Sequence, residues 1–230
     1  MEEVITLGRG ALELRSPGHS DRALTLNNVA NYLRDRFLKF GANADLDEAI
    51  LLHQSALDLR PAGHSDLSTS LHNLAVCFSD RYNKQGTIAD LEEAITLRRA
   101  ALEPRSPGHS RRASTLYNLA SDLRDRFLEL DMDCDLDEAN SLHRSALNLH
   151  PQGHHDHAKS IDKLLLLVRK RIQRHDMIAD LDECISLGRS ALASREARNP
   201  SRVTYLHDLV TDLHSRLRKL ENISNVQSTS

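Results

Sequence analysis

The sequence has no tryptophan, and Phe, Trp and Tyr together make up only 3% of its 230 residues. An apolar core must therefore be built from Leu, Ala, Ile and Val. The three cysteines, Cys77, Cys134 and Cys184, lie far apart in the chain, which argues against both a disulfide framework and a zinc site. The longest apolar run, at 164–168, is much shorter than a membrane-spanning helix requires.

The charges give no field of a single sign. Thirty Lys and Arg residues are interspersed with 33 Asp and Glu residues, and the net charge is -3. We therefore expect neither nucleic acid nor an anionic membrane as a partner.

The N-terminus lacks the basic and then apolar segments of a secretory signal, which favours a cytoplasmic location. The sequence contains no nucleophile elbow, glycine-rich phosphate loop or His-Glu-x-x-His motif, so we expect no catalytic residue, metal or cofactor.

The most informative feature of the chain is an internal repeat with a period of 45 residues. The segment Asp-Leu-Asp-Glu-Ala-Ile at 45–50 returns in closely related form at 90, 135 and 180. Gly-His pairs at 18, 63, 108 and 153 keep the same spacing. A fixed period in this range predicts a solenoid, in which each unit buries its apolar face by stacking on its neighbours.

Each period predicts two helices. Within 45–60, apolar side chains recur at three- and four-residue steps, and Asp45 is placed in the first turn to cap free backbone N–H groups. A second segment, at 66–83, has the same periodicity. Gly86 in the following turn is expected to adopt a left-handed conformation. No part of the period alternates as a strand does, so the predicted fold class is all-α.

The motif Leu-x-Asn-Leu-Ala, present at 71–75 and 116–120 and as Leu-Asn-Asn-Val-Ala at 26–30, resembles the long tetratricopeptide repeats of kinesin light chains. The 45-residue period and the Pro-Gly-His link are also similar to the arrays of large fungal proteins that carry a CHAT protease-like or NTPase domain. The resemblance implies a right-handed superhelical solenoid of antiparallel helix pairs. It divides 1–220 into an orphan second helix at 1–15, pairs at 20–60, 65–105, 110–150 and 155–195, and a terminal helix at 200–220; 221–230 is then a disordered tail.

The resemblance also implies a concave groove, lined by the first helix of each pair, that binds protein or peptide. Asn28, Asn73 and Asn118 match the family's asparagine that contacts a peptide backbone, and an amide suits this role because it both donates and accepts hydrogen bonds. Arg34 and Arg124 would attract acidic ligand side chains. The predicted groove residues are Asn27, Asn28, Asn31, Arg34, His72, Asn73, Tyr117, Asn118, Ser121 and Arg124. The alternative for the asparagines is a hydrogen-bonded ladder between stacked helices.

Two other recurring residues have a structural interpretation beside ligand binding. Arginines at 36, 81, 126, 171 and 216 end the first helix of each copy. The structural interpretation is an ion pair with the acidic start of the next helix or a contact with the C-terminal end of the helix dipole. The histidines of the Gly-His link, at 19, 64, 109 and 154, are too far apart to share a metal ion, which favours capping or packing of the link. The cluster at 154–157 (His-His-Asp-His) matches no tight metal site.

The fourth unit and the N-terminal edge depart from the pattern. Lys163 and Leu165 replace the Asn and the small Ala of the earlier units, so ligand binding through the asparagines should be confined to the first three. The helix at 1–15 has an apolar stripe and no preceding partner, which predicts self-association or docking there. The sequence thus predicts a non-catalytic scaffold for an unidentified protein or peptide. The alternative is a fragment or regulatory sensor arm of a larger signalling protein whose CHAT-like or NTPase effector domain is absent.

Overall fold

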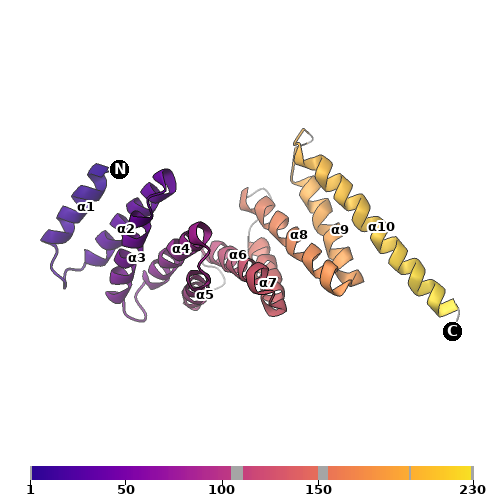
Figure 1. The fold of residues 1–230 in the computed structure, drawn as a ribbon, viewed down its shortest axis with the longest axis horizontal. Coiled ribbons are helices and arrows are strands. Elements are labelled where there is room, and N and C mark those ends of the chain that lie inside the picture. The colour runs from indigo at the N-terminus through magenta and orange to yellow at the C-terminus, as the bar shows by residue number, and fades with distance from the viewer. Residues whose placement is uncertain (1, 105–110, 150–154, 197, 229–230) are drawn as a thin grey trace. The chain divides into compact units, whose positions relative to one another are not determined.

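The computed structural model describes residues 2–104, 111–149, 155–196 and 198–228. These residues form helices and no strands, and successive helices run in opposite directions within each pair (Figure 1). The helices are α1 (Glu2–Leu14), α2 (Arg22–Phe40), α3 (Asn43–Asp58), α4 (Leu67–Gln85), α5 (Ile88–Leu102), α6 (Arg112–Leu130), α7 (Asp133–Leu149), α8 (His155–His175), α9 (Ile178–Ala193) and α10 (Ser201–Ser228).

The helices pack into two compact units, residues 1–122 and 123–230, whose boundary falls inside α6. In the N-terminal unit α2 packs on α3 and α4 on α5, and in the C-terminal unit α8 packs on α9 and α9 on α10. The sequence predicted one array over 1–220. Two local cores arise within such an array because each helix pair contacts only its neighbours.

The core of the N-terminal unit is mostly aliphatic, as the composition requires, and it also includes Phe37 and Cys77. Ile5, Leu33 and Leu46 are at most 1% exposed and belong to one cluster with residues of α4 and α5. Ala30 and Ala75 are fully buried at the same repeat position, where a small side chain lets two helices approach closely. Each buried Leu or Ile contributes roughly 1.5–3 kcal/mol through the hydrophobic effect, so the repeated apolar positions account for the pairing of the helices.

The arginine that ends each first helix ties its helix pair together. Arg36 in α2 donates hydrogen bonds of 2.7 and 2.6 Å to the carboxylate of Asp45, nine residues later in α3. The same contact recurs as Arg81–Asp90, Arg126–Asp135 and Arg171–Asp180. The structural interpretation of the repeated arginine is confirmed for these four copies.

A second carboxylate reaches these arginines from the preceding helix pair. Arg81 Nη1 lies 3.0 Å from Asp47 Oδ1, 34 residues earlier in α3. The equivalent contacts are Arg36–Glu2, Arg171–Asp137 and Arg216–Asp182. Hydrogen bonds to Asp90, and more weakly to Asp47, raise the pKa of Arg81. Arg36, Arg81 and Arg171 therefore each contact a carboxylate of a preceding helix as well as one of their own helix pair.

The prediction that Asp45 caps its helix is wrong. The helix begins at Asn43, the N-cap residue is Ala42, and no side chain makes a capping hydrogen bond there. Asp45 is 7% exposed and its carboxylate is bound by Arg36. The ion pair takes the carboxylate because a bidentate contact with a guanidinium is stronger than a bond to a neutral N–H group.

The turn inside each helix pair uses a left-handed residue at one repeat position. Gly41 and Gly86 have φ of 76° and 72°, and their N–H groups donate to Phe37 O and Tyr82 O. Asp131 and Asp176 occupy the same position in the later copies, with φ of 58° and 50°. The predicted left-handed conformation of Gly86 is confirmed, and Asp is one of the few other residues that tolerates it.

Replacing Gly86 with alanine is expected to lower the free energy of unfolding by about 1–2 kcal/mol, because a Cβ disfavours the left-handed region. No heavy atom lies within 4 Å of the Cβ position, so crowding does not contribute. Gly18→Ala is the control, since that glycine is equally uncrowded and lacks a positive φ. Urea unfolding of both variants measures the difference; equal stability of the two would contradict the conformational explanation.

The histidines of the Gly-His link stabilise the turn between helix pairs. His19 Nδ1 accepts a hydrogen bond of 3.1 Å from the Asp21 N–H, and His64 Nδ1 accepts one of 3.0 Å from the Asp66 N–H. Asn199 binds the Ser201 N–H in the same way at the last link. The favoured capping role is confirmed for His19 and His64, whereas residues 109 and 154 lie outside the described residues.

The last helix is longer than the sequence indicated. α10 continues to Ser228, whereas a terminal helix at 200–220 and a disordered tail from 221 were expected. The segment 221–228 contains neither glycine nor proline, so nothing in it stops a helix that has already formed. Loss of apolar periodicity was therefore a poor signal for the end of this helix.

Candidate functional site

The first helices of the N-terminal unit present an amide at one repeat position. Asn28 in α2 is exposed, and Asn73 in α4 and Asn118 in α6 are half-buried. Within the described ranges none of the three side chains takes part in a hydrogen bond, an ion pair or a ring contact. The ladder of amides between stacked helices, which was the structural alternative, is therefore not formed in the described part of the chain.

Asn27 does not belong to this surface, contrary to the expectation that it contacts ligand. It is 5% exposed, and its Nδ2 donates to Ser70 Oγ at 3.1 Å. His53 Nδ1 lies 2.7 Å from its Oδ1, and Arg60 also donates to Ser70 Oγ. Asn27 therefore anchors a buried polar network that joins α2, α3 and α4.

The two predicted groove arginines are held by internal carboxylates. Arg34 Nε donates to Asp80 Oδ2 at 2.5 Å, so the pair joins α2 to α4. Arg124 binds the neighbouring Asp125 with bonds of 2.9 and 2.6 Å. Their charges are largely neutralised before any ligand arrives, which removes the reason for expecting them to attract acidic side chains.

The remaining predicted residues flank the amides with varied side chains. Asn31 is exposed one helical turn after Asn28, whereas His72 and Tyr117 are half-buried. Ser121 donates to Tyr117 O within α6 and is also half-buried. The side chains beside the three equivalent amides therefore differ from copy to copy, as selective recognition requires.

A buried charge network next to α4 and α6 was missed at the level of sequence. Arg98 in α5 is 3% exposed and donates to Asp122 Oδ2 and, at 2.8 Å, to Ser79 Oγ. Ser79 in turn donates to Asp122 Oδ1 at 3.1 Å. The available signal was that Arg98 stands where the neighbouring copies have His53 and His143. This network orients α4 and α6, which carry two of the three amides.

Three other features of the described residues bear on function: possible metal ligands, possible membrane-spanning helices and the cysteines. Among them, no group of three or more His, Cys, Asp and Glu side chains is placed to hold a metal ion, and residues 154–156 of the His-His-Asp-His segment have no described side chains. No helix in the described ranges combines the length and the apolar composition needed to cross a membrane. Cys77, Cys134 and Cys184 are all free thiols, and burial raises the pKa of Cys77 to about 12.

Comparison with known proteins places this geometry in a family. Residues 22–66 and 67–108 each match the tetratricopeptide repeat profile. Residues 22–108 of the chain belong to the tetratricopeptide repeat family. The two matched segments carry α2 to α5, and so include Asn28, Asn73 and both complete helix pairs of the N-terminal unit. The resemblance stated from the Leu-x-Asn-Leu-Ala motif is confirmed.

Two solved structures show the same fold as this chain. The nearly identical TPR-like repeats of a putative kinesin light chain from Podosopora anserina align over 91% of this chain and 94% of that one, with 16% identity and a TM-score of 0.57. BtubC (BKLC) from P. vanneervenii aligns over 99% and 91%, with 15% identity and a TM-score of 0.61. The predicted all-α repeat fold is confirmed. A search of curated proteins finds no match.

Proposed function

We propose that this chain is a non-catalytic scaffold that binds an extended segment of a partner protein along α2, α4 and α6. Tetratricopeptide repeats are protein-interaction modules, and the surface that supports this role here is the column of Asn28, Asn73 and Asn118. The observation that carries the proposal is that these three equivalent amides reach the surface and make no hydrogen bond among the described residues.

The chemistry of this surface favours recognition of a peptide backbone. Each amide both donates and accepts, so it can bind the C=O and N–H groups of an extended segment regardless of its side chains. Asn31, Val76 and Ser121 stand one turn further along the three helices, and their differences would select the partner's side chains. Because Arg34 is neutralised by Asp80, we propose a ligand that is polar or apolar rather than strongly acidic.

The triple variant Asn28→Ala, Asn73→Ala, Asn118→Ala is expected to weaken partner binding roughly a hundredfold, since each lost hydrogen bond costs about 1 kcal/mol. Affinity capture with the wild-type chain identifies the partner segment, and titration calorimetry then compares the two proteins. A control carries alanine at three asparagines outside the column, Asn43, Asn83 and Asn222, all exposed. Equal affinity of the triple variant and the control would refute the proposed surface.

A cytoplasmic setting without nucleic acid fits the same proposal. Three free cysteines in one chain are usual where thiols are kept reduced. The net charge is -3, and carboxylates bind the first-helix arginines Arg36 and Arg81, so these two cations are not free to bind phosphates.

The second candidate is a regulatory arm of a larger signalling protein, in which the array senses a ligand and another domain acts. The apolar side chains exposed on α1 and α10 favour it, since further segments of such a protein would cover them. Full-length transcripts from the source organism decide this question: coding sequence for an effector domain in the same frame would support the regulatory arm, and its absence would exclude it.

A further inference from the structure

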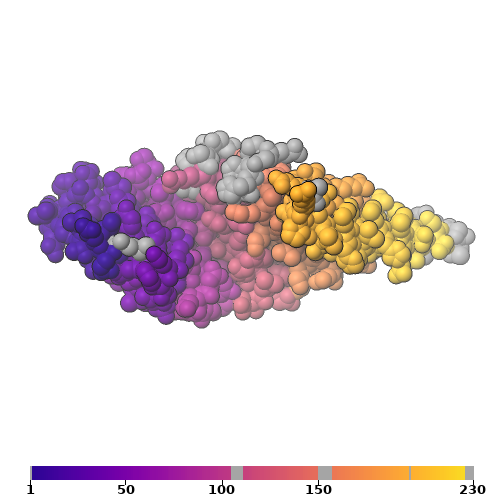
Figure 2. Space-filling model, turned by 90° about the horizontal axis from the view of Figure 1, so that it is seen from above, coloured from indigo at the N-terminus to yellow at the C-terminus, as the bar shows by residue number. Residues whose placement is uncertain are grey.

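The last helix exposes positions that are buried in the first complete helix pair. Val203, Leu206, Val210 and Leu217 in α10 are 73%, 49%, 66% and 56% exposed. Four periods earlier, Ala23, Leu26, Ala30 and Phe37 in α2 are 7%, 4%, 0% and 6% exposed, because α3 packs on α2. Figure 2 shows α10, in yellow, at the surface of the molecule. α10 thus has the form of a first helix whose second helix is missing from the described residues.

The first helix of the chain has the converse form, that of a second helix without its first helix in the described residues. α1 occupies the repeat positions of α3, which is a second helix, and Ile5 is buried as Ile50 is. Val4 and Leu7 are 39% and 67% exposed, whereas Ala49, one period after Val4, is fully buried. The exposed face of α1 is therefore the face that α3 turns toward α2.

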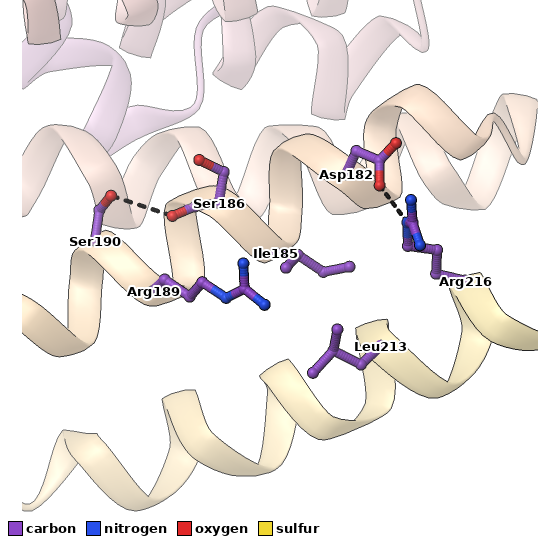
Figure 3. Close-up of a pocket in the computed structure, with 7 residues that line it drawn as sticks. All are labelled: Asp182, Ile185, Ser186, Arg189, Ser190, Leu213 and Arg216. Carbon is purple, nitrogen blue, oxygen red and sulfur yellow. Dashed lines mark hydrogen bonds and ion pairs between the residues drawn. The ribbon is translucent and has the colours of Figure 1, made fainter.

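A cavity between α9 and α10 marks the place where a second helix would lie. Its volume is about 480 Å³, and it is lined by Asp182, Ile185, Ser186, Arg189, Ser190, Leu213 and Arg216 (Figure 3). The equivalent positions in the N-terminal unit include Ile5 and Leu33, which share a core cluster with Ala49 and Ile50 of α3. In that unit α3 fills the equivalent space.

The charges around the cavity match those of α1. Arg9 in α1 binds Glu48 in α3 with bonds of 2.7 and 2.6 Å, and Arg144 binds Glu183, its counterpart three periods on. Arg189 is the next arginine of this series, and the glutamate at the repeat position of Glu48 in α1 is Glu3. In the part of the chain that the structure describes, neither Arg189 nor Glu3 has an ion-pair partner.

We propose that copies of this chain associate head to tail, with α1 of one copy packed against α9 and α10 of the next. In this arrangement α1 replaces the missing second helix. Leu7 and Val4 cover the stripe of α10, and Glu3 meets Arg189 as Glu48 meets Arg9. None of these residues belongs to the amide column, so the proposal is independent of peptide binding.

A second copy is the occupant that the observations favour, because α1 supplies both the apolar stripe and the glutamate in the repeat register. The interface joins different surfaces of two identical chains, and each copy retains one free surface of each kind. Association of this heterologous type continues beyond a dimer into a ring or a filament. A symmetric contact of α1 with α1 would not bring Glu3 to Arg189 and would stop at two chains.

Sedimentation of the wild-type chain over a range of concentrations is the first test. Its mean mass is expected to rise beyond that of a dimer, and each of two variants, Leu7→Glu and Val210→Glu, is expected to remain a monomer. A mixture of the two variants should form a dimer and nothing larger, since each variant retains the surface that the other has lost. Circular dichroism verifies that both are folded, as expected for exposed positions.

The mixture distinguishes the proposal from its alternatives. A wild-type chain that stays monomeric, or that stops at a dimer, overturns it, as does a mixture of folded variants that fails to dimerise.

Reversing the charge of Arg189 or Glu3 alone, in Arg189→Glu or Glu3→Arg, should weaken association about threefold, the scale of an exposed ion pair. The double reversal should restore it, and failure of that rescue would remove the predicted register.

Discussion

Replacing Arg98 with leucine is expected to lower the free energy of unfolding of the N-terminal unit by about 3–5 kcal/mol. Arg98 and Asp122 are 3% and 5% exposed, so the substitution removes a buried guanidinium from a buried carboxylate. Ser79 still donates a hydrogen bond to Asp122, which is weaker than the charge-assisted bond that Arg98 donates. Urea unfolding followed by far-UV circular dichroism measures the loss.

A double variant separates the buried charge from the change in packing. His143 and Leu167 stand at the positions of Arg98 and Asp122 one period later, so Arg98→His with Asp122→Leu installs a pair that the chain already uses. Removing both charges should recover most of the lost stability, because a buried ion pair contributes little net free energy relative to apolar side chains. A single variant that costs less than about 1 kcal/mol would contradict the assigned role of the pair.

Mild acid is expected to destabilise both units through His53 and His143. Both side chains are 0% exposed. Burial, with smaller contributions from Arg34 and Arg60, lowers the pKa of His53 to about 4. Burial, followed by Arg124 and Lys163, lowers the pKa of His143 to about 3. Both imidazoles are therefore neutral in the folded chain near pH 7.

The direction of the effect follows from where the protons bind. The unfolded chain takes up a proton near pH 6.5, and the folded chain does so only near pH 4 for His53 and pH 3 for His143. Stability is therefore complete above pH 6.5 and falls as the pH is lowered through this window. At pH 5 each histidine accounts for a loss of about 2 kcal/mol, at 1.36 kcal/mol for each pH unit.

The double variant His53→Gln, His143→Gln tests this expectation. Its free energy of unfolding should change with pH much less than that of the wild type between pH 6.5 and pH 4. Glutamine is neutral throughout and can bind Asn27 as His53 does. His214→Gln, on the exposed surface of α10, controls for the loss of an imidazole as such. A double variant that keeps the wild-type slope would assign the acid sensitivity to carboxylates instead.

The repeat period predicted the fold because each period repeats the same pattern of apolar, charged and turn residues. Arg36 was expected to pair with the acidic start of the next helix, since one ends a helix and the other begins the next, and its observed partner Asp45 lies nine residues later. Gly86 was expected to be left-handed for a similarly local reason. Features decided within a single helix pair were therefore accessible from the sequence.

Features that depend on contacts between helix pairs could not be predicted from the sequence. Asn27 and Asn28 are adjacent, yet one residue of helix turns the side chain by about 100°, from the surface into the core. Asn27 is buried because Ser70 and His53 satisfy its amide, and those partners lie 43 and 26 residues away. Arg34 was misjudged for the same reason, since Asp80 belongs to the next helix pair. The sequence pattern of a buried polar network does not differ from that of a solvent-exposed polar surface.

The arginine that ends each first helix has an evolutionary consequence. Arg81 takes one carboxylate from nine residues ahead and another from 34 residues behind, so both partners fall within the 45-residue period that surrounds it. Duplication or deletion of a whole period in the gene therefore keeps an arginine such as Arg81 between two acids. Chain length can change in steps of one period without compensating mutations at the junctions, which makes variation in copy number an accessible route by which such proteins diverge.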